Sequence, residues 1–215
     1  MVRVLLVALA ALSLTVATPH LIAEVPTKKT IVSVALPHGV TVELPRNWVV
    51  FSDNSTVTLD AYALAISSRN GIKLDSDLPF AANLYNDKRE AVAVFNIRYY
   101  PDQDITQKDV RTISESGISE LDSMLRAEFS KSSPAMGMKI LSWHGTKAAR
   151  VGNKNAFITE YERSGIADDK PFRVRLVRVL DGPSSFTITV SYRAREAFFL
   201  RPICDTIIAS VKTTR

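Results

Sequence analysis

Cysteine is nearly absent from this chain, since Cys204 is the only one among 215 residues. A single thiol cannot form an internal disulfide bond, so the stability of the fold must come from an apolar core. It also leaves no cluster of cysteine and histidine with the spacing of a zinc site. Cys204 lies in the apolar pattern of the last predicted helix, and we expect it to be a small buried hydrophobic residue.

Glycine and histidine are also scarce. The chain has 8 glycines, and none of them belongs to a P-loop or a G-x-S-x-G elbow. His38 and His144, the histidines beyond residue 23, lie at a turn and before a glycine, where a surface role is the ordinary interpretation. We therefore predict no catalytic residue, no cofactor and no metal site. A carboxylate pair or a triad assembled from distant residues stays open, because distance in space defines it.

The one long apolar run lies at the start of the chain. Met1-Val2-Arg3 is basic, residues 4–17 are uncharged and mostly apolar, and Ala17-Thr18-Pro19 follows. This order predicts a signal peptide over 1–23, and the run is too short to cross ~30 Å of hydrocarbon as a helix. Cleavage is expected after Ala17 or Ala23, and an uncleaved anchor is the alternative. The mature protein would then be periplasmic or secreted.

The rest of the chain, 24–215, contains no linker, internal repeat or low-complexity tract, and we predict that it forms a single domain. Its positive charge is mild, because the whole chain carries a net charge of +5. Export makes nucleic acid a poor partner, so we predict no nucleic-acid binding. We also predict no stable transmembrane span once the leader is removed, because no second long apolar run exists.

Hydrophobic periodicity predicts an α+β domain that ends in a β-meander. Thr106 and Asp109 have the spacing of a capping box at the start of a long helix, and Pro202 predicts a break or kink in the last helix. The predicted strands are 31–36, 40–44, 48–51, 80–85, 91–100, 139–143, 148–151, 155–163, 172–180 and 185–192; the predicted helices are 55–68, 106–132 and 196–211.

Charges on two of these strands predict their register. If the strands pair antiparallel, setting Glu162 opposite Arg173 also sets Glu160 opposite Arg175. The apolar residues further along the two strands then face one another as well. Opposite charges and apolar pairs are the cross-strand neighbours that stabilise a sheet, and a slip by one residue would move every side chain to the other face.

Arginines make the C-terminal third of the chain basic. Arg173, Arg175, Arg193 and Arg195 are our candidates for a partner-binding basic patch, which would suit a phosphate, a lipid headgroup, peptidoglycan or an acidic protein. The ordinary alternative is that the glutamates of the neighbouring strand neutralise Arg173 and Arg175 within the sheet.

The run GVTVELPRNW at 39–48 is followed by a short helix, a hairpin, a long helix, a meander and a closing helix. This order resembles the fold group of PsbP from photosystem II and DcrB from the bacterial periplasm, over most of 31–211. The resemblance implies a twisted antiparallel β-sheet sandwiched by helices (α/β/α, PsbP-like) and an accessory or interaction role. It brings no catalytic residues to this sequence. The lack of a lipoprotein cysteine after the leader departs from the lipidated relatives.

Our leading functional prediction is a non-catalytic exported protein of the bacterial cell envelope that binds an envelope protein or a small ligand. One alternative is an envelope hydrolase, whose sign would be a pocket with His144 or His38 within hydrogen-bond reach of an acid and a hydroxyl. Another is a small-ligand-binding periplasmic protein, whose sign would be an apolar cavity between the sheet and the long helix.

Overall fold

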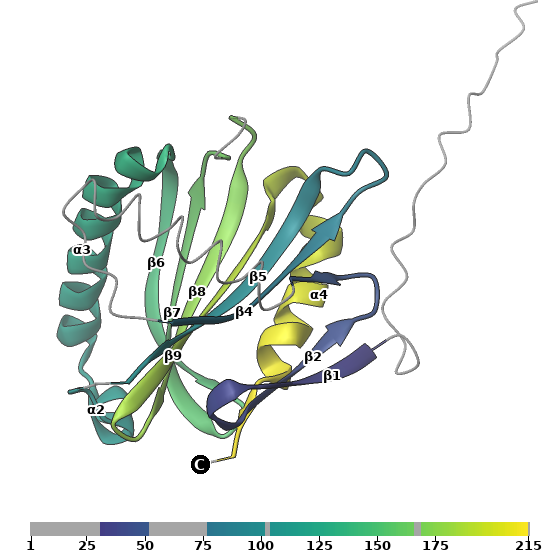
Figure 1. Ribbon diagram of the computed structural model, residues 1–215. Helices are drawn as coiled ribbons and strands as arrows, with labels where there is room; N and C mark the ends of the chain where they lie inside the picture. Colours follow the sequence, from purple (N-terminus) through teal and green to yellow (C-terminus); the bar gives the residue numbers. More distant parts are fainter. Residues whose placement is uncertain (1–30, 52–76, 102–103, 166–168, 215) are drawn as a thin grey trace, which may run out of the picture.

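The computed structural model describes residues 31–51, 77–101, 104–165 and 169–214 (Figure 1). The predicted signal peptide over 1–23 and the predicted helix over 55–68 lie outside these ranges and stay predictions. Within these ranges, every helix is too short or too polar to span a bilayer.

Within the described ranges, the strands form two antiparallel sheets. The smaller sheet has the order β1-β2-β10, and the larger sheet has the order β3-β4-β5-β9-β8-β7-β6. The strands of the smaller sheet are β1 (Ile31–Leu36), β2 (Val40–Pro45) and β10 (Lys212–Thr213). Those of the larger sheet are β3 (Val49–Val50), β4 (Asp77–Tyr85), β5 (Ala91–Tyr100), β6 (Ile140–Val151), β7 (Lys154–Arg163), β8 (Phe172–Asp181) and β9 (Ser184–Arg193).

Helices cover both faces of the larger sheet, which confirms the predicted α+β class (Figure 1). On one face lie α2 (Gln107–Thr112) and α3 (Glu115–Ser132), and on the other lies α4 (Ala197–Ser210). The 3₁₀ turns are η2 (Pro37–Gly39), η3 (Ser133–Met136) and η4 (Ala194–Glu196).

The main core lies between the larger sheet and α4. Ile97, Val177 and Ile188 of the strands are fully buried with Cys204 and Ile207 of the helix. Because a strand alternates its side chains between two faces, the same strands supply a smaller cluster beneath α2 on the other side. Burial raises the pKa of Cys204 to about 12, so the thiol stays neutral and packs as an apolar residue, as the sequence predicts.

The long predicted helix over 106–132 is wrong as a continuous element. The predicted capping box at Thr106 and Asp109 is present and starts α2, but Ile113 adopts an extended conformation with ψ 133°. Ser114 then begins α3, because its hydroxyl accepts a hydrogen bond from the Gly117 amide at 3.1 Å. A serine side chain is more favourable at the start of a helix than in its interior, because its hydroxyl can accept from a free backbone amide. The apolar periodicity therefore continues although the helix is interrupted.

Two predicted strands, 139–143 and 148–151, are one long strand, β6. The pairing of β6 with β7 shifts register between Trp143 and Gly145, where Gly145 has a φ of +100°. Such a bulge keeps a strand in its sheet while it interrupts the side-chain alternation from which a strand is recognised. His144 therefore lies inside a strand rather than beyond the end of one.

The predicted register of β7 and β8 is confirmed. Glu162 pairs with Arg173, and Glu160 pairs with Arg175. The break expected at Pro202 is absent, since α4 continues from Ala197 to Ser210 through this residue. Pro202 has no amide to donate to the Phe198 carbonyl one turn earlier, and both residues lie on the exposed side of α4.

Candidate functional site

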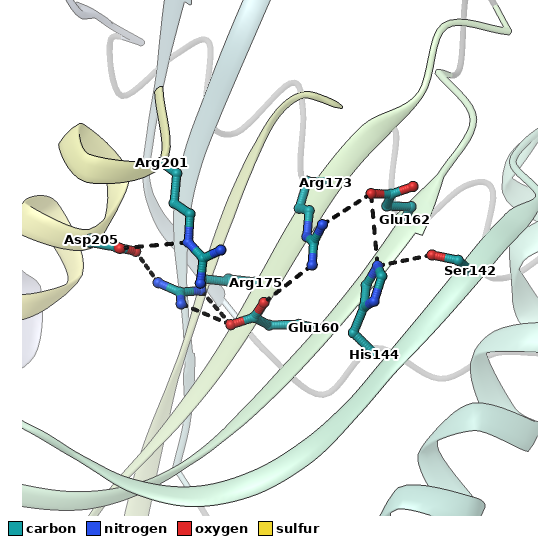
Figure 2. Close-up of polar contacts among 8 residues, drawn as sticks. All are labelled: Ser142, His144, Glu160, Glu162, Arg173, Arg175, Arg201 and Asp205. Carbon is teal, nitrogen blue, oxygen red and sulfur yellow. Dashed lines mark hydrogen bonds and ion pairs between the residues drawn. The ribbon is translucent and has the colours of Figure 1, made fainter. Parts of the chain in front are cut away.

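A chain of polar contacts crosses the α4 face of the larger sheet, from β6 through β7 and β8 to α4 (Figure 2). We call it the ion network. Its members are Ser142, His144, Glu160, Glu162, Arg173, Arg175, Arg201 and Asp205. The alternation of side chains brings the members on β7 and β8 to this one face, because they occupy every second position of their strands.

The centre of the ion network follows from the strand register. Arg173 Nη1 lies 3.2 Å from Glu162 Oε1, and Arg175 Nε donates to Glu160 Oε1 at 2.8 Å. Arg173 also reaches Glu160 at 3.9 Å, so the two cross-strand pairs are joined. The Glu160 and Arg175 side chains are 14% and 13% exposed, which makes this pair the most enclosed in the ion network.

Arg175 connects the sheet to α4 through a further ion pair with Asp205. Burial alone would raise the pKa of Glu160, but the hydrogen bond and the charge of Arg175 outweigh burial and leave this pKa below its ordinary value. Burial would lower the pKa of Arg175, and the bond to Glu160 reverses that effect and raises it. Both residues are therefore charged, and each stabilises the charge of the other.

The arrangement of Ser142, His144 and Glu162 does not form a catalytic relay. His144 Nε2 lies 2.9 Å from Ser142 Oγ and 3.7 Å from Glu162 Oε1, so one ring nitrogen meets both groups. A nucleophile and base in a hydrolase need the hydroxyl at one ring nitrogen and the orienting acid at the other. Glu162 is moreover bound by Arg173. The geometry expected of an envelope hydrolase is not present at His144.

His38 is the other histidine considered for a hydrolase site. It lies in η2 with a φ of 62°, and its ring stacks on Tyr99 with the ring centroids 3.7 Å apart. Stacking on a tyrosine at a turn is a packing role, which agrees with the ordinary interpretation of this residue.

The four arginines of the predicted basic patch do not share one surface. Arg173 and Arg175 lie in the ion network, while Arg193 faces the opposite side of the sheet, 6% exposed, with its guanidinium 4.3 Å from the Phe172 ring centroid. Arg195 is in η4, is 62% exposed and pairs with Glu196 at 3.2 Å. Partner binding by these residues stays a prediction, but they would have to act separately.

A cavity that sequence reasoning missed lies near α2, where the turn between β6 and β7 approaches this helix. Its volume is ≈ 430 Å³. The described residues that line it are Gln107, Lys108, Arg111, Arg150, Asn153 and Asn155. The basic residues come from segments about 40 positions apart, and no spacing in the sequence connects them. Among the residues that the structure describes, no group of three histidine, cysteine or acidic side chains could hold a metal ion.

Comparison with known proteins identifies the fold. No family model matches the chain, and no curated protein matches it. The solution structure of cyanobacterial PsbP (CyanoP) from Synechocystis sp. PCC 6803 is similar with a TM-score of 0.55 and 10% identity, over 88% of this chain and 95% of that one. This chain therefore has the PsbP-like fold, as its resemblance to that fold group implies. At this level of identity, the likeness concerns the fold alone.

Two other solved structures are more distant. One is LpqN from Mycobacterium tuberculosis, described as involved in cell envelope biogenesis, with a TM-score of 0.43 and 14% identity over 86% of this chain and 91% of that one. The other is PA94 from Pseudomonas aeruginosa, described as a putative regulator, with a TM-score of 0.43 and 12% identity over 86% of this chain and 97% of that one.

Proposed function

We propose that this protein is a non-catalytic accessory protein of the bacterial cell envelope, exported by its N-terminal leader, and that it acts by binding. The observation that carries the proposal is the ion network. Its three arginines face three carboxylates, and together they connect β7 and β8 to α4. The reactive side chains of this face thus serve to hold the fold together.

Two further observations support binding rather than turnover. His144 directs one ring nitrogen at both Ser142 and Glu162, which is unsuited to proton relay. The PsbP-like fold offers a rigid sheet with helices on both faces, a scaffold on which loops and helix ends present binding groups.

The experiment that tests this proposal expresses the full chain in a Gram-negative bacterium and follows its location and its activity. We expect the protein in the periplasmic fraction, with a mature N-terminus after Ala17 or Ala23. Cross-linking in intact cells followed by purification should recover an envelope protein. A broad hydrolase screen should give no turnover above that of buffer.

Ser142→Ala and His144→Ala are the matched controls for the screen. Any turnover that both substitutions abolish would overturn the non-catalytic proposal, because it would show that these side chains act on a substrate. An intact Met1 on membrane-bound protein would overturn the proposal of a cleaved leader.

A further inference from the structure

The cavity near α2 has the charge and the construction of an anion-binding site. Lys108 and Arg111 lie three positions apart on α2, which places them on one side of this helix. Arg150, close to the end of β6, and Asn153 in the following turn complete the lining from the sheet. Three cationic groups therefore converge on one hollow from two elements that are distant in the sequence.

Gln107 fixes the position of α2 against the sheet. Its side-chain nitrogen donates to the carbonyl oxygens of Asn155 at 2.9 Å and Leu180 at 2.6 Å. Its side-chain oxygen accepts from the Asn155 amide at 2.7 Å, and the Asn155 side chain donates back to the Gln107 carbonyl at 3.2 Å. This clamp binds the first turn of α2 to β7 and β8, so the separation of the cationic side chains from the sheet is set by hydrogen bonds.

None of the described residues that line the cavity is acidic. The nearest carboxylate on the same helix belongs to Asp109, and it accepts hydrogen bonds from the Thr106 amide at 2.8 Å and from the Thr106 hydroxyl at 2.6 Å. Those hydrogen bonds, and to a smaller extent the charge of Lys108, lower the pKa of Asp109 and hold its charge at the helix start. Asp181, further along β8, pairs with Lys154 at 2.7 Å. Neither carboxylate forms an ion pair with Lys108, Arg111 or Arg150.

In a second hollow on the molecule, acids of the lining balance part of the positive charge. This hollow is lined by Asn86, Asp87, Lys88, Glu90, Lys170 and Arg195. There Lys170 pairs with Glu90 at 3.2 Å, and the lining contains two acids beside three cations. The cavity near α2 has the same number of cations and no described acid. An anionic ligand is what would balance it.

We propose that this cavity binds a phosphate group, carried either by a small soluble ester or by the headgroup of an anionic lipid. Arginine offers a planar fork of donors that matches phosphate oxygens in pairs, and lysine adds a mobile point charge. The side-chain amide of Asn153 adds neutral donors. The volume of ≈ 430 Å³ falls in the range of small-ligand sites, so the hollow has room for an organic phosphate.

This inference names a ligand class and a site, and it does not depend on export or on a protein partner. The first test is calorimetric titration of the purified protein with inorganic phosphate and with glycerol 3-phosphate at low ionic strength. We expect binding of both, tighter for the ester. Lys108→Gln/Arg111→Gln should lower the affinity at least about tenfold, because it removes two charge-assisted donors.

Arg126→Gln/Lys131→Gln is the matched control. It removes the same two charges from exposed positions on α3, away from the cavity lining. Unchanged affinity in this control would support the site. Equal losses in the two double variants would overturn it, because phosphate would then respond only to net charge. Absence of binding by the unmodified protein at millimolar phosphate and ester, together with absence of vesicle binding, would also overturn it.

Vesicle flotation separates the two sources of the phosphate group. Vesicles of phosphatidylglycerol and phosphatidylcholine are compared with vesicles of phosphatidylcholine alone. Flotation with the anionic vesicles that Lys108→Gln/Arg111→Gln abolishes and the control double variant retains would assign the headgroup. Ester binding without flotation would assign a soluble ligand. Both results concern purified protein, so they stand whatever the outcome of the localisation and cross-linking experiments.

Discussion

The ion network and the cavity near α2 each bring three cationic side chains together, with opposite results. In the ion network, Arg173, Arg175 and Arg201 meet carboxylates at 2.8 to 3.9 Å, and the charges are balanced within the protein. In the cavity, Lys108 and Arg111 face another cation, with no acid among the described lining residues. Strand register pairs the charges of the ion network, whereas the cations of the cavity come from a helix and from the end of a distant strand. A cluster of arginines is therefore informative about binding only once its acids have been located.

Among the changes considered for the two regions, removal of Arg175 should destabilise the protein most. Arg175→Ala leaves Glu160, 14% exposed, without its closest partner and removes the connection to Asp205. Breaking an enclosed ion pair from one side typically costs about 3 kcal/mol. Urea unfolding followed by circular dichroism should show this loss. Arg201→Ala is the control, since its side chain is 51% exposed and 3.9 Å from Asp205, and it should cost less than about 1 kcal/mol. Equal costs would mean that the ion network is no more than a solvated surface.

Gln107 holds α2 against the sheet beside the cavity, and Gln107→Ala should have the second largest effect on the free energy of unfolding. The substitution removes three hydrogen bonds between α2 and the sheet and should cost about 2 kcal/mol. Phosphate affinity should fall as well, although no charge is altered. Thr112→Ala on the same helix is the control, because its hydroxyl bonds only to the Lys108 carbonyl one turn earlier. Retained affinity in Gln107→Ala would show that the cations do not need the clamp.

Acid should act on the ion network through Glu160, whose pKa is lowered by Arg175 and whose carboxyl can be removed by one substitution. A carboxyl group whose pKa is lower in the folded state than in the unfolded state stabilises the fold at pH values above its ordinary pKa, which is 4.5 for Glu160. This contribution is lost as the pH falls through the pKa of the folded state. Glu160→Gln lacks the titrating group. The stability gap between the unmodified protein and Glu160→Gln, about 1 kcal/mol at neutral pH, should therefore narrow below pH 4.5. Glu128→Gln, at an exposed position of α3, is the control for the loss of one carboxylate.

Much of the sheet could be predicted, because residues that are close together in the sequence determine how its neighbouring strands pair. The register of β7 and β8 follows from charges at alternate positions, and the structure reproduces each pair. The predictions were wrong for the helix over 106–132 and for the strands over 139–143 and 148–151, because the apolar pattern does not reveal a break or a bulge in the backbone. Ile113 ends one helix and Ser114 caps the next while the apolar period continues, and Gly145 carries β6 through a bulge where the alternation stops. Periodicity reports which face is buried, and it does not report whether the backbone is continuous.

The candidate site was only half predictable. Glu160 and Glu162 could be matched to arginines because their strands are adjacent in the chain. Arg150 could not be connected with Lys108 and Arg111, because the hydrogen bonds of Gln107 that unite them join α2 to strands far along the chain. The separation of Arg193 from Arg173 could have been found, since Arg193 pairs with Phe172 and so faces the side of the sheet that Arg173 does not.

The smallest change in the free energy of unfolding is expected for the cavity cations, and it distinguishes a role in ligand binding from a role in stability. Lys108→Gln/Arg111→Gln should leave the free energy of unfolding within about 0.5 kcal/mol of its original value, or raise it slightly, because both side chains are exposed and repel each other. Any gain should vanish at high salt, where exposed charges are screened. Denaturation at low and high ionic strength measures both effects. A loss above about 1 kcal/mol would place these cations among the groups that stabilise the fold, as in the ion network, and would remove the contrast between the two regions. An unchanged stability beside a tenfold loss of phosphate affinity would show that the charge of this cavity is kept for a ligand.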